Sequence, residues 1–313
     1  MLSSGRVKFN PRARLNTSQV RRRGPSSSGG RVGLGARPGG MILPGGVGGL
    51  LLLVVVVVFM QLSGGSGGTD GSPGYDDTQI AGADLSQCET GADATASQDC
   101  RIVATVNSVQ AYWDDALPEQ AGVAYEGSVT NLFSGSVDTG CGAATSDVGP
   151  FYCPSDDSVY LDTSFFDAML EGQLGARGGD FAESYVVAHE YGHHVQDLLG
   201  TMERVRSEQG ATSDAVRLEL QADCYAGMWA RHATTVEDEF GEVFILELSE
   251  GDVAEAIDAA ESVGDDRIQE QTQGQSNPET WTHGSAADRK QWFLTGMRTG
   301  DLAACDTFSA SQL

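Results

Sequence analysis

The sequence predicts an α+β domain that is mostly helical with a small sheet and is preceded by one transmembrane helix. Two short runs of strand-forming residues, near 128–134 and 157–162, stand among longer segments with helical periodicity. An uncharged apolar stretch of transmembrane length, 41–62, lies upstream of all of them. The expected helices cover about 98–115, 163–172, 181–199, 214–232, 251–263 and 283–299.

The charges divide the 313-residue chain into a basic first part and an acidic remainder. Residues 1–62 hold nine Lys and Arg and no acid, whereas residues 63–313 hold ten Lys and Arg against 44 Asp and Glu. An acidic body of this strength repels polyphosphate, so we expect no nucleic-acid partner. A basic flank on one side of an apolar segment predicts that this flank stays in the cytoplasm.

These patterns predict four parts. Residues 1–40, rich in Arg, Gly and Ser, are expected to form a disordered basic cytoplasmic tail, and residues 63–80 a flexible linker. Residues 41–62 are expected to be a membrane anchor; a cleaved signal peptide is the alternative, disfavoured because the preceding region is long and no A-x-A site follows. Residues 81–313 are expected to be one extracytoplasmic domain. The prediction is a single-pass cell-membrane protein with a cytoplasmic N-terminus.

All six cysteines follow the apolar segment, and none belongs to a C-x-x-C pair. An even number of cysteines in an exported domain favours disulfides over metal-binding thiols. Six cysteines allow fifteen connectivities. The local spacings suggest Cys88–Cys100 and Cys141–Cys153, which leaves Cys224 and Cys305 to join the middle of the domain to its end.

The candidate chemistry is concentrated in one apolar helical segment, 181–199, which contains His189-Glu190-x-x-His193. Two His at i and i+4 stand one turn apart on one helix face, so both imidazoles can bind one metal ion. Glu190 is expected beside them, where it can take a proton from a metal-bound water. Two solvent-exposed His on a helix would explain neither the adjacent Glu nor the apolar flanks.

A zinc enzyme of this type needs a third protein ligand. Asp197 lies eight residues, or roughly 12 Å, beyond His189, which is too far to share one ion. The next helical segment offers Glu219 and Asp223, again at i and i+4. We expect Glu219 to complete a His₂Glu site and Asp223 to accept the free ring N–H of a ligating His. His194 is expected near the cleft rather than on the metal.

Five longer strings of the sequence are distinctive: "GPFYCPSDDSVYLDTSFF" (149–166), "VAHEYGHHVQ" (187–196), "LELQADCYAGMWA" (218–230), "WTHGSAADR" (281–289) and "CDTF" (305–308). Together they resemble the bacterial membrane-anchored neutral zinc metallopeptidases, a gluzincin-like family with the pattern HExxH…ExxxD. The resemblance implies a zincin-like metallopeptidase fold, one Zn²⁺ per chain, and a peptide or protein substrate.

The expected reaction is hydrolysis of a peptide bond by zinc-activated water, with Glu190 as general base. An oxyanion donor is still needed, and His283 is the first candidate, followed by Tyr160 on an expected strand along the cleft. A structural role is the alternative for both. His232 is expected to be a surface or packing residue.

Two other functions are compatible with the sequence. The domain could bind zinc and act as a proteolytically silent binding or assembly module in the cell envelope. It could also hydrolyse a different amide, such as a cell-wall cross-link. The intact Glu190 favours hydrolysis over the silent module, because a scaffold needs no base beside the metal. The oligomeric state is left open.

Overall fold

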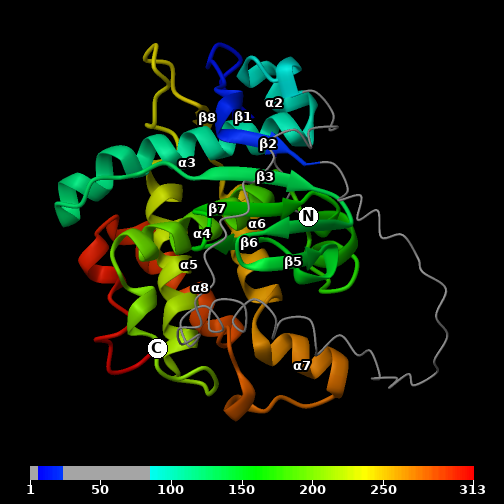
Figure 1. Cartoon of the computed structure of the whole chain (residues 1–313), viewed down its shortest axis with the longest axis vertical. Helices are drawn as coiled ribbons and strands as arrows, with labels where there is room; N and C mark the ends of the chain where they lie inside the picture. Colours follow the sequence, from blue (N-terminus) through cyan, green and yellow to red (C-terminus); the bar gives the residue numbers. More distant parts are fainter. Residues whose placement is uncertain (1–5, 24–84) are drawn as a thin grey trace, which may run out of the picture.

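The structure is a computed structural model that describes residues 6–23 and 85–313 (Figure 1). This part of the chain is α+β and mostly helical with small sheets, as predicted. Its strands are β1 (Lys8–Phe9), β2 (Val20–Arg22), β3 (Val129–Phe133), β4 (Ser136–Thr139), β5 (Gly142–Thr145), β6 (Phe151–Cys153), β7 (Ser158–Asp162) and β8 (Ile245–Glu247). Its helices are α2 (Gly91–Ala96), α3 (Gln98–Ala121), α4 (Asp180–Leu198), α5 (Asp214–His232), α6 (Glu250–Ser262), α7 (Asp265–Gln273) and α8 (Ala286–Thr299).

The main sheet has four strands in the order β2-β3-β7-β6. β2, β3 and β7 run parallel, and β6 pairs antiparallel with β7 at the edge. Side chains alternate between the two faces of a strand. On β7, Val159 and Leu161 therefore enter the main core, whereas Tyr160 joins a smaller cluster with Phe133 and Phe151.

The helices that carry the predicted motifs, α4, α5 and α8, pack closely because glycines stand at their contacts. A Cβ atom added at Gly192 of α4 would lie 3.0 Å from the Cα atom of Ala222 on α5. A Cβ atom added at Gly296 of α8 would lie 1.8 Å from the carbonyl oxygen of Cys224 on α5. Only glycine permits such close approach of backbones. The packing brings side chains of three helices, distant in sequence, to one buried place.

The expectation of a disordered tail over residues 1–40 is wrong for residues 6–23. β2 extends the main sheet by pairing with β3, and β1 pairs antiparallel with β8. Val7, Phe9 and Val20 are at most 3% exposed and belong to the main core. Strands of two or three residues are too short to show an alternating pattern in the sequence, which explains the wrong prediction. In Figure 1 these strands lie beside α2 and α3.

The predicted anchor 41–62 and linker 63–80 lie outside the described residues. Among the residues that the structure describes, no helix combines the length and the apolar character needed to cross a membrane.

The three predicted disulfides are all present: Cys88–Cys100, Cys141–Cys153 and Cys224–Cys305. The first two close short loops of the same sequence separation, 12 residues, and the third spans 81 residues.

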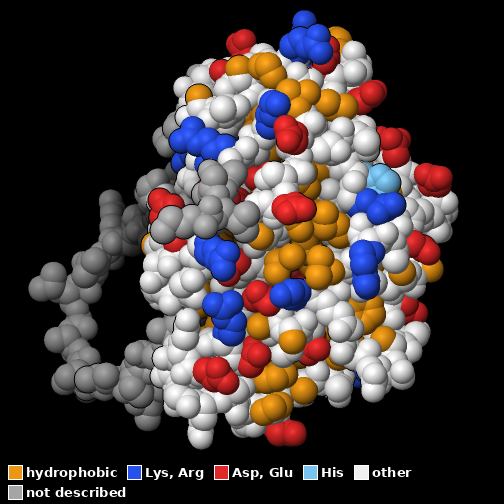
Figure 2. Space-filling model, turned by 180° about the vertical axis from the view of Figure 1, so that it is seen from behind, with side chains coloured by type: hydrophobic (Ala, Val, Ile, Leu, Met, Phe, Trp, Pro, Cys, Tyr) orange, Lys and Arg blue, Asp and Glu red, His pale blue; other side chains and the backbone are white. Residues whose placement is uncertain are grey.

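On the face of the molecule turned away from the view of Figure 1, acidic, basic and apolar side chains are interspersed (Figure 2). Among the described residues visible on that face, no large patch of a single charge stands out.

Candidate metal centre

Helix α4 places His189, Glu190 and His193 in a buried site, with each residue only 7% exposed. The two imidazole centroids are 4.9 Å apart and their planes are nearly perpendicular, at 88°. This is the spacing expected for i and i+4 residues on one helix face. The two rings can therefore reach the same point in space.

Helix α5 supplies the third group. Glu219 Oε2 lies 3.2 Å from His189 Nε2, and Glu219 Oε1 lies 3.5 Å from His193 Nε2. The candidate ligand atoms of the three residues all lie within 4.8 Å of one another. Two imidazoles and one carboxylate are a donor set that suits zinc with one position left open.

The imidazole of His189 is oriented from behind by a buried charged group. Its Nδ1 donates to Asp223 Oδ1 at 2.9 Å, and Arg289 of α8 binds both oxygens of the same carboxylate, at 2.8 and 3.0 Å. The hydroxyl of Tyr185 donates to Asp223 as well. Burial alone would raise the pKa of Asp223, but the charges of Arg289 and His189 lower it. The carboxylate stays ionised, and it holds His189 with Nε2 free for a metal.

The imidazole of His193 is oriented by a neutral amide. Its Nδ1 donates to Gln196 Oε1 at 2.8 Å, which again leaves Nε2 facing Glu219. Gln196 is itself fully buried and donates through Nε2 to the carbonyl oxygen of Leu218 and to Gln221 Oε1, at 2.7 and 3.1 Å. Both candidate ligand rings are thus held by hydrogen bonds on the side away from the site.

The two glutamates of the site differ in their electrostatics. Burial alone would raise the pKa of Glu219, but the nearby His193 and His283 hold it well below its ordinary value. Burial raises the pKa of Glu190, and the two imidazoles offset only part of that rise. Among the described residues, no hydrogen bond engages the Glu190 carboxylate. Glu219 suits a metal ligand, and Glu190 suits a group that exchanges protons.

A protein-family model described as "Putative neutral zinc metallopeptidase" matches residues 10–308. The chain belongs to this family. It is 58% identical over 234 residues to the uncharacterized proteins Rv2575 of Mycobacterium tuberculosis and Mb2605 of Mycobacterium bovis, a match that covers 74% of this chain and 78% of each relative. It is 46% identical over 199 residues to the uncharacterized protein YpfJ of Escherichia coli, over 62% of this chain and 66% of that protein. No solved structure matches the chain.

In this member of the neutral zinc metallopeptidase family, the structure brings His283 close to the candidate ligand Glu219. His283 is 5% exposed, and its proximity is one cause of the low pKa of Glu219. Asp265, the first residue of α7, accepts three consecutive backbone N–H groups, those of Thr282, His283 and Gly284, at 2.8, 2.6 and 3.0 Å. The loop that carries His283 is therefore fixed by one carboxylate.

The prediction that Tyr160 belongs to the catalytic site is wrong. Its ring stacks on Phe151, and its hydroxyl donates to Asp156 Oδ2 at 2.7 Å. As described above, Tyr160 points to the face of the sheet opposite to Val159 and Leu161, which pack in the core with α4. The expected strand is present, but the alternation of side chains along it turns this residue away.

His194 and Asp197 lie on the sheet side of α4, where both contact the hydroxyl of Tyr152 on β6, at 3.2 and 2.9 Å. His194 Nε2 donates to the carbonyl oxygen of Glu126 at 2.6 Å. The exclusion of both residues as metal ligands agrees with this placement. His232 stacks on Tyr112, with ring centroids 5.4 Å apart, which agrees with a packing role.

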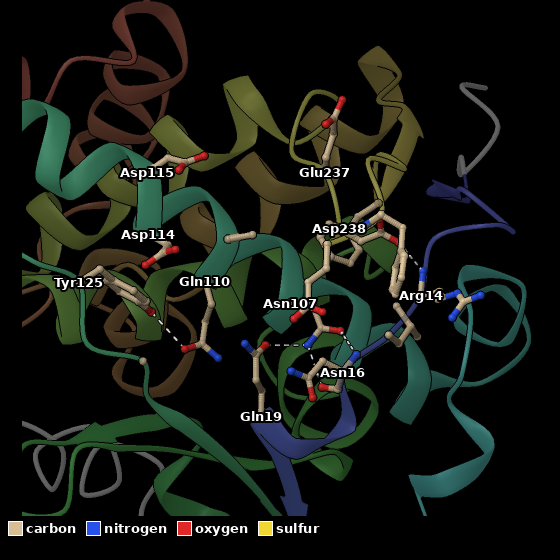
Figure 3. A pocket seen from close by; sticks show the side chains of 16 residues that line it. Arg14, Asn16, Gln19, Asn107, Gln110, Asp114, Asp115, Tyr125, Glu237 and Asp238 are labelled. Carbon is tan, nitrogen blue, oxygen red and sulfur yellow. Dashed lines mark hydrogen bonds between the residues drawn. The ribbon is translucent and has the colours of Figure 1, made fainter.

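A hollow elsewhere on the described part of the chain is lined by none of the three candidate ligands (Figure 3). It lies along α3 and the loop that carries Glu237 and Asp238. Its charged lining residues are Arg14, Asp114, Asp115, Glu237, Asp238 and Glu239.

The sequence interpretation missed the residues that hold the ligands in place. Tyr185 and Gln196 stand at i−4 from His189 and i+3 from His193, so the helical period could have indicated both. Asp265 and Arg289 reach the site from helices far along the chain. Arg289 ends the string 281–289 noted above, but no helical period linked either residue to the ligands.

Proposed function

We propose that the chain is a zinc-dependent peptidase whose metal is held by His189, His193 and Glu219, one Zn²⁺ per chain. The convergence of the two Nε2 atoms and the Glu219 carboxylate beside Glu190 carries this proposal. The family description supports both the metal and the peptide substrate. When bound, zinc supplies a Lewis acid that polarises a scissile carbonyl and makes water more acidic.

The chain's own residues then carry the proton and the charge. A carboxylate oxygen of Glu190 takes a proton from the attacking water and delivers it to the leaving amine nitrogen as the C–N bond breaks. A raised pKa suits this exchange, because the same group must accept and then release the proton. Burial of the site keeps competing water away from the carboxylate.

We assign the oxyanion contact to His283. The hydroxyl of Thr282 lies 2.7 Å from His283 Nδ1. When this hydroxyl donates to Nδ1, the ring proton is on Nε2, which can donate to the carbonyl oxygen as negative charge develops. Replacement of His283 by Ala should lower kcat by about 10²–10³-fold with a much smaller change in KM.

The test uses the full-length chain, because residues 6–23 complete the main sheet. The chain is loaded with zinc and incubated with a mixed peptide library, and the cut sites are mapped by mass spectrometry. Glu190→Gln should retain zinc and lose about 10²–10⁴-fold in kcat/KM. Asp197→Asn, the same chemical change on the other side of α4, is the matched control and should cleave like the parent.

Each other outcome has a distinct meaning. Zinc bound at one per chain without cleavage by the parent would overturn the peptidase function, leaving a silent envelope module or hydrolysis of a cell-wall amide. Equal cleavage by Glu190→Gln and the parent would overturn the role of Glu190. Failure of the parent to bind zinc would overturn the metal site.

We infer further that residues 6–23 work in the same compartment as residues 85–313, outside the cytoplasm. The three disulfides support an oxidising compartment. A segment that crosses a membrane once places its two flanks on opposite sides. The pairing of β2 with β3 and of β1 with β8 instead supports a location of both flanks of residues 24–84 on one side. This proposal replaces the predicted cytoplasmic N-terminus.

A further inference from the structure

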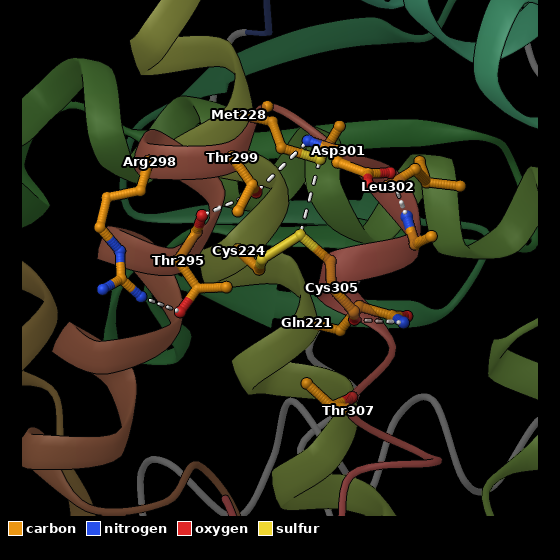
Figure 4. The surroundings of a disulfide bond; sticks show 12 residues. Gln221, Cys224, Met228, Thr295, Arg298, Thr299, Asp301, Leu302, Cys305 and Thr307 are labelled. Carbon is orange, nitrogen blue, oxygen red and sulfur yellow. Dashed lines mark hydrogen bonds between the residues drawn. A yellow bond between two sulfur atoms is a disulfide. The ribbon is translucent and has the colours of Figure 1, made fainter.

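The two candidate zinc ligands are supported by different means, and the support of His193 leads out of the site. The Nδ1 atom of His189 is bonded to a charged group, Asp223 paired with Arg289. The Nδ1 atom of His193 is bonded to the first of two linked neutral amides, Gln196 and Gln221, which we name the amide relay. Gln221 is 4% exposed, and its Nε2 donates to the carbonyl oxygen of Cys305 at 3.0 Å (Figure 4).

The directions of the hydrogen bonds in the relay are set by two backbone carbonyl oxygens, that of Cys305 at its far end and that of Leu218 at Gln196. The carbonyl oxygen of Cys305 can only accept, so the Nε2 of Gln221 faces it and the Oε1 of Gln221 faces Gln196. That oxygen accepts from Gln196 Nε2, whose other acceptor is the carbonyl oxygen of Leu218. Gln196 must then present Oε1 to His193.

The orientation of Gln196 selects the tautomer of His193. An oxygen facing Nδ1 can only accept, so the ring proton is on Nδ1 and the lone pair on Nε2. Only this tautomer can donate an electron pair to a metal at the point shared with Glu219. The Cys305 carbonyl thus acts on the ligand through two buried amides.

The carbonyl of Cys305 is itself fixed to α5 by the Cys224–Cys305 disulfide. Cys224 follows Asp223 directly on the helix that also carries Glu219. Figure 4 shows the disulfide beside the Gln221 side chain, with Met228 of α5 on one side of it and Thr307 of the C-terminal segment on the other. Thr307 Oγ1 donates to the carbonyl oxygen of Arg217 at 2.6 Å, which holds the C-terminal segment against α5 at a second point.

We propose that Gln196, Gln221 and the Cys224–Cys305 disulfide are positioning groups for the zinc ligand His193. The disulfide fixes a carbonyl, the carbonyl orients two amides, and the amides keep Nε2 of His193 free and aimed at the metal. The proposal rests on the function proposed above, because it requires that zinc binds at this site.

The test measures the zinc affinity of the full-length chain by competition with a chromophoric chelator. Gln196→Leu removes the acceptor at His193 and should weaken zinc binding about 10–100-fold. Gln221→Leu leaves Gln196 bonded to Leu218, so a smaller loss, about twofold to tenfold, is expected. In the double variant the Gln221 change should add nothing further, because the relay is already cut at Gln196.

The disulfide has a matched control in the same chain. Cys224→Ala/Cys305→Ala should weaken zinc binding about twofold to tenfold. Cys88→Ala/Cys100→Ala removes a disulfide at the start of α3. Arg101, beside this disulfide, pairs with Glu183 of α4. Glu183 lies six residues, or about 9 Å along the helix, before His189. This variant should keep the parent affinity. Circular dichroism of each metal-free variant verifies that it is folded.

The outcomes separate this inference from the proposed function. A parent that binds no zinc would overturn the metal site as a whole. If the parent binds zinc and Gln196→Leu binds it equally tightly, the relay alone is overturned. Additive losses in the double variant, or equal losses on removal of either disulfide, would show a general effect on stability and also overturn it.

Discussion

The N-terminal segment, residues 6–23, and the helix pair α4–α5 are both held in the fold by buried contacts, but the balance between apolar and polar contacts differs. The segment is attached by apolar side chains such as Phe9, by short strand pairings and by a few hydrogen bonds, such as that from the buried Asn10 to Glu242. The helix pair adds buried polar and charged side chains, among them Asp223 and Gln196, to its apolar packing. Apolar contacts are non-directional, whereas hydrogen bonds fix atoms in position.

In this molecule, the contacts that attach a segment to the fold are therefore separable from the hydrogen bonds that align the candidate zinc ligands. Loss of apolar contact at the segment should reduce stability and leave the metal site intact in every chain that remains folded. Loss of a hydrogen bond behind His189 or His193 should reduce zinc affinity in chains that remain folded. At Asp223 it should also cost stability, because the buried Arg289 would lose its carboxylate. The predictions below test this division, and the first asks whether the segment is where the fold requires it to be.

The largest expected effect is on the chemical labelling of Lys8 in intact cells, which is either present or absent. Lys8 and Lys290 are the only two lysines of the chain, and both side chains are substantially exposed, at 63% and 44%. An amine reagent that cannot cross membranes should label both in intact cells that produce the full-length chain, as seen by peptide mass mapping. Labelling after lysis is the control for reactivity. If Lys290 is labelled in intact cells and Lys8 only after lysis, the two regions lie on opposite sides of a membrane and the shared fold is wrong.

The sequence predicted α4 and α5, the helices that carry the candidate ligands, because the patterns that indicate them are local. The HExxH spacing, the i and i+4 pair of Glu219 and Asp223, and the apolar flanks all lie within one helix length. The N-terminal strands have partners more than 100 residues away, at β3 and β8, so no local period revealed them. Tyr160 shows an intermediate case: its strand was predicted, but not the face of the sheet on which its side chain lies.

The next largest effect is on stability. Phe9 is 3% exposed in the main core, so Phe9→Ala should lower the free energy of unfolding by about 3–5 kcal/mol. Phe240→Ala is the matched control: that ring is 64% exposed, and its loss should change the free energy by less than about 1 kcal/mol. Urea unfolding of the full-length chain measures both. Equal effects of the two changes would mean that the segment is not part of the core.

The zinc affinity of the candidate site is expected to change about tenfold per pH unit. Burial would lower the pKa of His189, but the charge and hydrogen bond of Asp223 outweigh it and raise this pKa to about 9. Below that pH the metal-free imidazole holds a proton that zinc must displace, so zinc affinity should rise about tenfold per pH unit up to about pH 9. Calorimetry in buffers of different ionisation heat should find at least one proton released per zinc at pH 7. Asp223→Asn removes the raising charge and should release fewer protons, and equal release would contradict this assignment.

The smallest effect on stability is expected at the ion pair that joins β1 to β8. Lys8 Nζ lies 3.3 Å from Glu247 Oε2, but both side chains are more than 60% exposed. Water screens such a pair, so Lys8→Met should change the free energy of unfolding by less than about 1 kcal/mol, and a double-mutant cycle with Glu247→Gln should give a coupling of similar size. A coupling as large as the effect of Phe9→Ala would reverse the division drawn above, because the segment would then be held by charge rather than by burial. A small coupling beside a large Phe9→Ala effect means that β1 stays on β8 because its apolar side chain enters the core.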